Sequence, residues 1–216
     1  MNPDSIFLQK LQAAGFEVIG ESLMQFSPVR FTNLPQTDWI FFYSKKAVRF
    51  FFENLQKTDL QINAKLAALG EGTAMEIEKQ GFKPYFVGNG EPEATAINFI
   101  KVAKNQRVIF PRAENSRQSV QQLLQGQIEE LDIVVYQNEP RQDFDIPECE
   151  WLVFTSPLNA EAYFQRYSTK AGQKIIAIGE TTAGVLRTIG LEKIQISESP
   201  SEEALADAIL QHSPMQ

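Results

Sequence analysis

The sequence predicts an α/β protein with two similar lobes, each a parallel sheet flanked by helices. A short aromatic and β-branched run, Asp38 to Ser44, is repeated much later as Glu150 to Ser156. Strand-like runs of this kind alternate with segments whose apolar residues have helical spacing, and no hairpin signal separates them. Such alternation is typical of parallel sheets covered by helices on both faces.

Each copy of this first repeat is followed by a predicted helix. Apolar residues recur at i, i+3, i+4 and i+7 from Val48 to Leu55, and again from Ala160 to Tyr167. The same spacing at the same distance from the strand indicates two copies of one strand–turn–helix unit.

A second repeat matches residues 66–74 with residues 175–183. The first copy alone has helical propensity, but the later copy begins as a buried-strand run. We therefore expect both to be strands that turn through glycine into helices, ending near Gly81 and Gly190. An acidic, proline-containing loop and a helix follow in each case, and these helices are expected over residues 96–103 and 204–210.

A third correspondence is incomplete. Residues 107–111, 116–124 and 132–136 have the pattern of strand, helix and strand, whereas near the amino terminus only a helix at 5–11 and a strand at 17–19 are expected. The first strand of lobe 1 is thus missing from the pattern. Either the chain begins one strand late or this lobe has a smaller sheet.

The order of these pieces predicts the domain organisation. Lobe 1 is discontinuous, formed by residues 1–24 with 141–216, and lobe 2 is formed by residues 33–131. Residues 25–32 and 132–140 are expected to be extended and paired, as a two-stranded β connection between flavodoxin-like lobes. Two such connections favour opening and closing of a cleft.

Composition excludes several classes of chemistry. The 216 residues carry a formal net charge of -7, the wrong sign for coating nucleic acid or anionic lipid. Cys149 and His212 are the single cysteine and histidine, too few for a zinc site or an intrachain disulfide. There is no apolar run near the ~20 residues that span a bilayer. We expect a cytoplasmic monomer with no metal and no nucleic-acid or membrane partner.

At this point the sequence resembles the uroporphyrinogen-III synthase family. No single motif carries the resemblance, which rests on an ordered set of segments. The set comprises residues 39–44 with Ala47-Val48, Gly70-Glu71-Gly72-Thr73-Ala74 with Gly81, Phe110-Pro111-Arg112 with Arg117, residues 134–137, residues 154–157, and residues 177–183 with Gly190 and residues 198–201. The family's first strand, commonly ending in Thr-Arg, is absent. Lys46 replaces an arginine of the family pattern, which keeps the charge but not the planar fork.

The resemblance implies a lyase of porphyrin and heme biosynthesis that acts without a cofactor. Its substrate would be hydroxymethylbilane, a linear tetrapyrrole with eight carboxylates, closed into uroporphyrinogen III with inversion of ring D and loss of water. The implied route ionises the terminal hydroxymethyl group to an azafulvene, passes through a spiro intermediate and recloses. Such a substrate requires shape control and many neutral donors.

Tyr136 is the candidate catalytic residue. It falls near the end of a predicted strand that enters the connection between lobes, and in the family the matching tyrosine is thought to assist departure of the hydroxyl group. A phenol with an ordinary pKa near 10 is protonated at neutral pH and can donate. The alternative is a half-buried strand tyrosine with a packing role.

The candidate substrate-binding residues are hydroxyl and cationic side chains at strand ends. Threonines after the two glycine turns can contact carboxylates together with free backbone N–H groups, or they can merely cap their helices. The same two interpretations apply to the serines that follow the first repeat. The full set is Ser44, Lys46, Thr73, Arg112, Arg117, Ser156, Thr181 and Thr182.

Two rival functions remain. A dinucleotide enzyme would need Gly-x-Gly-x-x-Gly, but Met75 and Glu93 occupy the third glycine position of the two nearest matches. A non-enzymatic, two-lobed cytoplasmic ligand-binding protein would fit the same lobes and connections. Binding of a tetrapyrrole without conversion would favour this second rival.

Overall fold

The computed structural model describes residues 5–58, 61–116 and 118–212. The chain folds as two compact units: unit 1 comprises Met1–Gln25 with Glu139–Gln216, and unit 2 comprises Phe26–Asn138. Both are built from strands and helices, which confirms the predicted α/β class. Within the described ranges, no helix is both long and apolar enough to cross a membrane.

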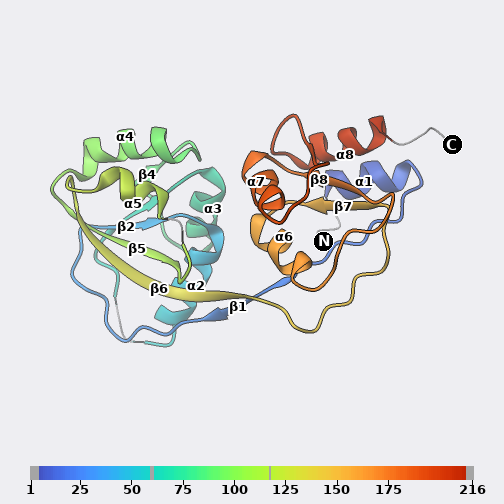
Figure 1. Cartoon of the computed structure of the whole chain (residues 1–216). Coiled ribbons are helices and arrows are strands. Elements are labelled where there is room, and N and C mark those ends of the chain that lie inside the picture. Colours follow the sequence, from blue (N-terminus) through green and yellow to red (C-terminus); the bar gives the residue numbers. More distant parts are fainter. Residues whose placement is uncertain (1–4, 59–60, 117, 213–216) are drawn as a thin grey trace. The chain divides into compact units, whose positions relative to one another are not determined.

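Unit 2 is built on a six-stranded mixed sheet, shown in Figure 1. Strand β1 runs antiparallel to β6. Two hydrogen bonds show this direction: Val29 N donates to Val135 O at 2.9 Å, and Arg141 N donates to Leu23 O at 2.8 Å. The other neighbours in the sheet are parallel. The strands are β1 (Met24–Pro28), β2 (Trp39–Phe42), β3 (Lys65–Ala68), β4 (Phe86–Val87), β5 (Arg107–Ala113) and β6 (Glu129–Pro140).

The parallel part of this sheet has the order β6-β5-β2-β3-β4. Counted from β5 as the first strand, that order is 2-1-3-4-5, the arrangement of flavodoxin-like sheets. The chain reaches β5 only after β2, β3 and β4, so the arrangement is circularly permuted. The carboxyl ends of β2, β3, β5 and β6 therefore lie at one edge of the sheet.

Helices cover both faces of this sheet. Alternation along β2 divides the core, since Ile40 and Phe42 pack with α2 and α3, whereas Trp39 and Phe41 pack with α4 and α5. The helices are α2 (Lys45–Leu55), α3 (Glu71–Lys79), α4 (Pro92–Ala103) and α5 (Ser119–Leu124).

Unit 1 has a three-stranded parallel sheet of order β7-β8-β9. Figure 1 shows α1 and α8 side by side, and both pack on the face that carries Ile176. Helices α6 and α7 pack on each other and against β7 and β8. The elements are α1 (Ile6–Ala13), β7 (Trp151–Phe154), α6 (Pro157–Phe164), β8 (Lys174–Ala177), α7 (Glu180–Thr188), β9 (Gln195–Ile196) and α8 (Glu202–Gln211).

The repeated elements are confirmed, including the glycine ends of α3 and α7, where Gly81 and Gly190 have φ of +86° and +95°. Three predictions need correction. Residues 17–19 do not form a strand. In unit 2, β6 pairs with β5, but the described part of unit 1 has no strand in the position of β5 with which residues 17–19 could pair. The helix expected from residue 116 begins at Ser119, since Gln118 is left-handed with φ of +52°. The predicted pairing of the two connecting segments is confirmed, but β1 and β6 join the sheet of unit 2, so this sheet is mixed and not purely parallel as predicted.

Candidate functional site

The turn after β2 places Ser44 at the start of α2. Its Oγ accepts a hydrogen bond from Ala47 N at 3.2 Å, so Ser44 is the amino-terminal cap of the helix. The Ser44 hydroxyl also hydrogen-bonds the Tyr136 phenol. The capping interpretation of Ser44 is therefore confirmed, and the same side chain contacts the candidate acid.

Tyr136 reaches this turn because β6 contains a bulge. Arg112 of β5 pairs with Val134, but Ala113 pairs with Tyr136, which leaves Val135 as an extra residue. Strict alternation would put Tyr136 on the same face as Val134. The extra residue turns its ring to the face of α2, where it stacks on Phe50 with centroids 5.1 Å apart.

The surroundings of Tyr136 favour its protonated form. Burial raises the pKa of the phenol, and the hydrogen bond from Ser44 offsets this only in part. Nearby, Lys46 Nζ lies 3.4 Å from the centroid of the Phe26 ring, and that ring lies 6.1 Å from the ring of Tyr136. Burial, and secondly the charge of Arg49, lower the pKa of Lys46. Unit 2 thus brings Ser44, Lys46 and Tyr136 together.

Arg112 lies at the same sheet edge, but its guanidinium is already engaged. Nη2 is 3.0 Å from Asp132 Oδ2, and Nη1 donates to the carbonyls of Ala113 and Glu114 at 3.0 and 2.9 Å. Its buried Nε has no hydrogen-bond partner among the described residues. A carboxylate ligand would have to compete with Asp132 for this side chain.

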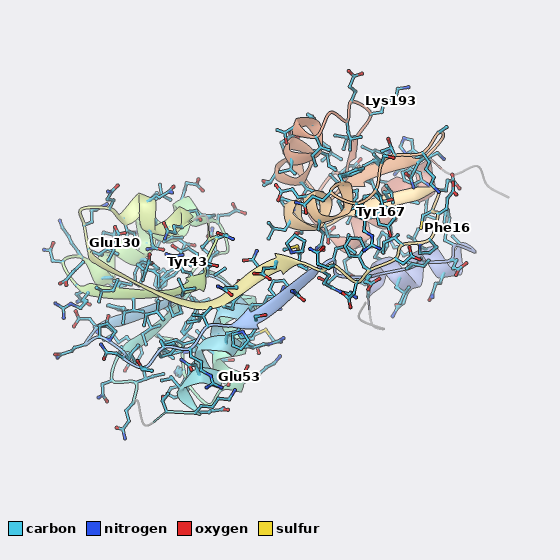
Figure 2. All side chains as sticks on the ribbon, turned by 60° about the horizontal axis from the view of Figure 1, so that its bottom comes forward. Phe16, Tyr43, Glu53, Glu130, Tyr167 and Lys193 are labelled. Carbon is cyan, nitrogen blue, oxygen red and sulfur yellow. The ribbon has the colours of Figure 1, made fainter. Side chains whose placement is uncertain are left out.

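Hydrogen bonds continue from Asp132, an exposed residue, to Gln121 and Tyr43. Gln121 Nε2 donates to Asp132 Oδ1 at 2.8 Å, and Gln121 N donates to the Tyr43 hydroxyl oxygen at 3.0 Å. Burial raises the pKa of Tyr43, and the carboxylates of Asp132 and Glu130 raise it further. Figure 2 labels Tyr43 and Glu130 within this unit. These contacts hold α5 on the sheet.

The two glycine turns leave helix amino termini without side-chain caps. Gly70 and Gly179 occupy the cap positions of α3 and α7, so the alternative in which the threonines are the caps is wrong. Thr73 and Thr182 are the third residues of their helices and are buried, 8% and 2% exposed, whereas Thr181 is exposed. The first-turn N–H groups and the helix dipole at both places favour anions.

Unit 1 holds the remaining described candidates. Ser156 caps α6, with its Oγ accepting from Asn159 N at 3.4 Å. Arg117 lies outside the described residues. No three His, Cys, Asp or Glu side chains in the described ranges gather closely enough to hold a metal ion.

Sequence reasoning missed three neighbours that define the site. Phe26 and Phe50 enclose the Tyr136 ring, and Asp132 occupies Arg112. Helix α5 separates Asp132 from Arg112 in the sequence, and no regular spacing of residues indicates that the two side chains pair. The two phenylalanines are indistinguishable by sequence from the many core phenylalanines.

Comparison with known proteins shows which family this sequence and fold match. A family model described as "Uroporphyrinogen-III synthase HemD" matches residues 6–207. The uroporphyrinogen-III synthase of Chlorobaculum parvum is 27% identical, over 94% of this chain and 92% of that protein. The crystal structure of uroporphyrinogen-III synthetase from Helicobacter pylori is 25% identical, covers 88% of this chain and 91% of that chain, and superposes with a TM-score of 0.76. A mutant synthase from Thermus thermophilus, 16% identical with a TM-score of 0.60 over 95% and 92% of the two chains, shares the fold.

The fold and its strand-end turns define a class, a two-unit α/β protein that presents hydroxyl groups, cations and helix amino termini at the carboxyl ends of its strands. The chain belongs to the uroporphyrinogen-III synthase family, the hydro-lyases of tetrapyrrole biosynthesis.

Proposed function

We propose that the chain binds hydroxymethylbilane and closes it to uroporphyrinogen III, with Tyr136 as the general acid. The observation that carries this proposal is the bulge in β6, which turns Tyr136 toward Ser44 and Lys46. A core tyrosine needs no such rearrangement, whereas bulges commonly re-aim a side chain beside an active site.

Tyr136 supplies the proton for the first step. The C–O bond of the terminal hydroxymethyl group breaks, the phenol proton goes to the departing oxygen, and water leaves as an azafulvenium cation forms; its positive charge balances that of the tyrosinate, and loss of its pyrrole N–H proton gives the azafulvene. Because burial raises the pKa of Tyr136, the phenol is protonated at neutral pH. Ser44 fixes the phenol oxygen by its hydrogen bond, and Lys46 supplies positive charge for a carboxylate.

The glycine turns supply the remaining donors. In unit 2, we propose that Thr73 and the N–H groups in the first turn of α3 donate to substrate carboxylates. The Lys45 side chain lies beside this turn, since a Cβ on Gly72 would be 2.9 Å from the Lys45 Cε. In unit 1, we propose Thr181, Thr182 and Ser156 as donors to substrate carboxylates. Arg117 stays a prediction, and the proposal does not extend to Arg112 because Asp132 already binds it.

Two finer expectations belong to the same proposal. The single cysteine, Cys149, is unpaired, which is the usual state in the reducing cytoplasm, and we propose that location. We also propose that the chain acts as a monomer.

The test is an isomer-resolved assay. Hydroxymethylbilane is generated in place by its upstream deaminase, and the products are oxidised and separated into type I and type III isomers. Spontaneous closure gives type I, so the proposal predicts that type III dominates and grows with enzyme concentration. A product that stays type I at every enzyme concentration would contradict it and favour a ligand-binding protein.

A further inference from the structure

A second polar side chain of β6, that of Asn138, lies on the same face of the sheet as Tyr136. Asn138 follows Tyr136 by two residues, and alternate residues of a strand share a face once the bulge at Val135 has been passed. A rise of about 3.3 Å per residue puts the two Cα atoms about 6–7 Å apart. Asn138 is therefore a near neighbour of the proposed general acid, on the face where Phe50 of α2 packs against Tyr136.

The pairing of β6 with β1 places Asn138 opposite Phe26. Main-chain hydrogen bonds at the two ends of this pairing set its register, namely Val29 N to Val135 O and Arg141 N to Leu23 O. The bonded positions are equally far apart on the two strands, so no bulge lies between them, and Asn138 faces Phe26 at a position where side chains of an antiparallel pair are closest. The Phe26 ring lies 6.1 Å from the ring of Tyr136 and 3.4 Å from Lys46 Nζ. Asn138 thus belongs to the group of side chains around Tyr136.

The side-chain carbonyl of Asn138 has no hydrogen-bond donor. Its Oδ1 is buried and finds no partner among the described residues. Leaving a buried acceptor unpaired costs free energy, so each such atom in a folded protein calls for an explanation, and a role in binding or catalysis is one. The residue as a whole is only half-buried, and the terminal torsion of asparagine has a broad range, so the amide can turn its oxygen to an incoming donor. Asn138 therefore offers an acceptor beside Tyr136.

This acceptor complements the other groups of the site. In their proposed roles Lys46, Tyr136 and the first-turn N–H groups of α3 are donors, which suit the carboxylates and the departing hydroxyl group of the substrate. The pyrrole rings of the same substrate carry N–H donors, for which these roles leave no acceptor. An amide oxygen accepts from a neutral N–H and, unlike the carboxylate of an aspartate, does not repel the carboxylates of the substrate. Asn138 therefore fits a pyrrole N–H group.

We propose that Asn138 is a further catalytic residue, whose Oδ1 accepts a hydrogen bond from the N–H group of the pyrrole ring that carries the hydroxymethyl group; this inference rests on the proposed function and extends it. The ring nitrogen and the hydroxymethyl group are attached to the same carbon, so the two residues that bind them must be neighbours, as Asn138 and Tyr136 are. When the C–O bond breaks, the ring becomes a cation and its N–H group a stronger donor. Asn138 takes no proton, but its hydrogen bond strengthens in the transition state and lowers the barrier.

Three variants of the full chain test this acceptor by turnover and stability. Asn138→Leu keeps a similar size and removes both polar atoms, so kcat for type III product should fall by about tenfold. Its Tm should stay the same or rise, because an apolar group replaces an unpaired buried acceptor. Asn138→Asp keeps acceptor oxygens and should retain at least about threefold more kcat than Asn138→Leu. Gln137→Leu is the matched control, since the next side chain of β6 points to the opposite face, and it should keep the wild-type kcat.

A binding cycle tests the N–H contact without turnover. Calorimetry measures the affinity of wild type and Asn138→Leu for an unreactive bilane that has a methyl group in place of the hydroxymethyl group. The second ligand is the same bilane with a furan in place of the terminal pyrrole next to that methyl group, which removes the N–H group without adding bulk. Wild type should bind the pyrrole form at least about threefold more tightly than the furan form, and Asn138→Leu should lose this preference.

Different results overturn the role of Asn138 and the proposed function. An unchanged kcat in Asn138→Leu, or the same preference for the pyrrole form in both proteins, would overturn the role of Asn138. A lower Tm in Asn138→Leu without rescue of kcat by Asn138→Asp would also overturn it, because the residue would then be structural. A wild type that binds the bilane but yields only type I product would instead contradict the proposed function, and the binding cycle would still decide whether Asn138 contacts the N–H group.

Discussion

Units 1 and 2 carry the same strand–turn–helix repeat but build different amounts of sheet around it. In unit 2, β2 lies between β3 and β5, and the sheet continues to β6 and β1. In the described part of unit 1, β7 has β8 as its one neighbour and lines a cavity of about 670 Å³. The repeat therefore determines local structure, whereas the flanking segments decide which chemistry each unit can carry.

The turns themselves are alike. Ser44 and Ser156 cap equivalent helices, and Gly70 and Gly179 start the next pair. The difference is Tyr136, which the bulge of β6 adds to the unit 2 turn. The proposed acid chemistry therefore belongs to unit 2, while both units have hydroxyl groups and free helix N–H groups at their strand ends.

The largest effect is expected for Tyr136→Phe. It removes the proposed proton donor and keeps the ring that stacks on Phe50, so turnover to type III product should fall by about tenfold or more at unchanged Tm. Tyr43→Phe is the matched control, since Tyr43 lies in the same unit but binds Gln121. It should lower stability by about 1 kcal/mol and keep turnover. Equal turnover of Tyr136→Phe and wild type would remove Tyr136 from the mechanism.

An ion pair between a buried glutamate and an exposed arginine distinguishes the helix pairs of the two units. In unit 2, Glu76 of α3 is 4% exposed and accepts from Arg49 Nε of α2 at 2.6 Å, whereas its repeat counterpart in unit 1 is Val185. Glu76→Gln should lower the free energy of unfolding by about 1–2 kcal/mol in denaturant titrations. Glu53→Gln, which breaks the exposed pair with Lys57, should cost at most about 0.5 kcal/mol.

The same pair predicts a pH dependence. The hydrogen-bonded guanidinium of Arg49 lowers the pKa of Glu76, so the folded state holds the ionised carboxylate more strongly than the unfolded state does. This stabilisation is complete above the ordinary glutamate pKa of about 4.3 and is lost as the pH falls through the lowered value. The stability difference between wild type and Glu76→Gln should therefore shrink on acidification. A constant difference would contradict the assignment.

The two capping serines offer a smaller and more selective comparison. Ser44→Ala and Ser156→Ala should each cost about 1 kcal/mol of stability, because each removes a helix cap. Ser44→Ala should also lower kcat by about threefold to tenfold, since Ser44 holds the Tyr136 phenol. For Ser156→Ala the expected change is in KM. A fall in kcat of the same size in both variants would contradict the proposal that the general acid lies in unit 2.

The smallest effect concerns α7, where Gly184 occupies the position of Met75 in α3. A Cβ on Gly184 would meet nothing within 4 Å, and its φ is not in the left-handed region. Gly184→Ala should therefore raise the free energy of unfolding by about 0.5–1 kcal/mol. Thermal and denaturant unfolding measure it, and a loss of stability would mean that the backbone of α7 needs glycine.

The repeat predicted most of the elements from sequence, because each copy settled the ambiguity of the other, as for β3 and β8. It failed where structure depends on a neighbour that sequence does not show. Residues 17–19 have strand composition but no strand to pair with among the described residues, and β4 and β9 are too short for a periodic signal.

The sequence predicted that the candidate site residues lie at the ends of strands, but not which of their side chains contact one another. Ser44, Lys46 and Tyr136 do converge, but strict alternation would have placed Tyr136 on the opposite face. The bulge at Val135 depends on the register between β5 and β6, which no local pattern encodes. For the same reason sequence could not show that Asp132 occupies Arg112.

A double-mutant cycle tests the central claim most directly, namely that Ser44 acts through Tyr136. The kcat for type III product is measured for wild type, Ser44→Ala, Tyr136→Phe and the double variant, with Tm as a check on folding. The account predicts that Ser44→Ala lowers kcat by about threefold to tenfold in the wild-type background and by less than about twofold in Tyr136→Phe. Independent, multiplying effects of the two substitutions would contradict it.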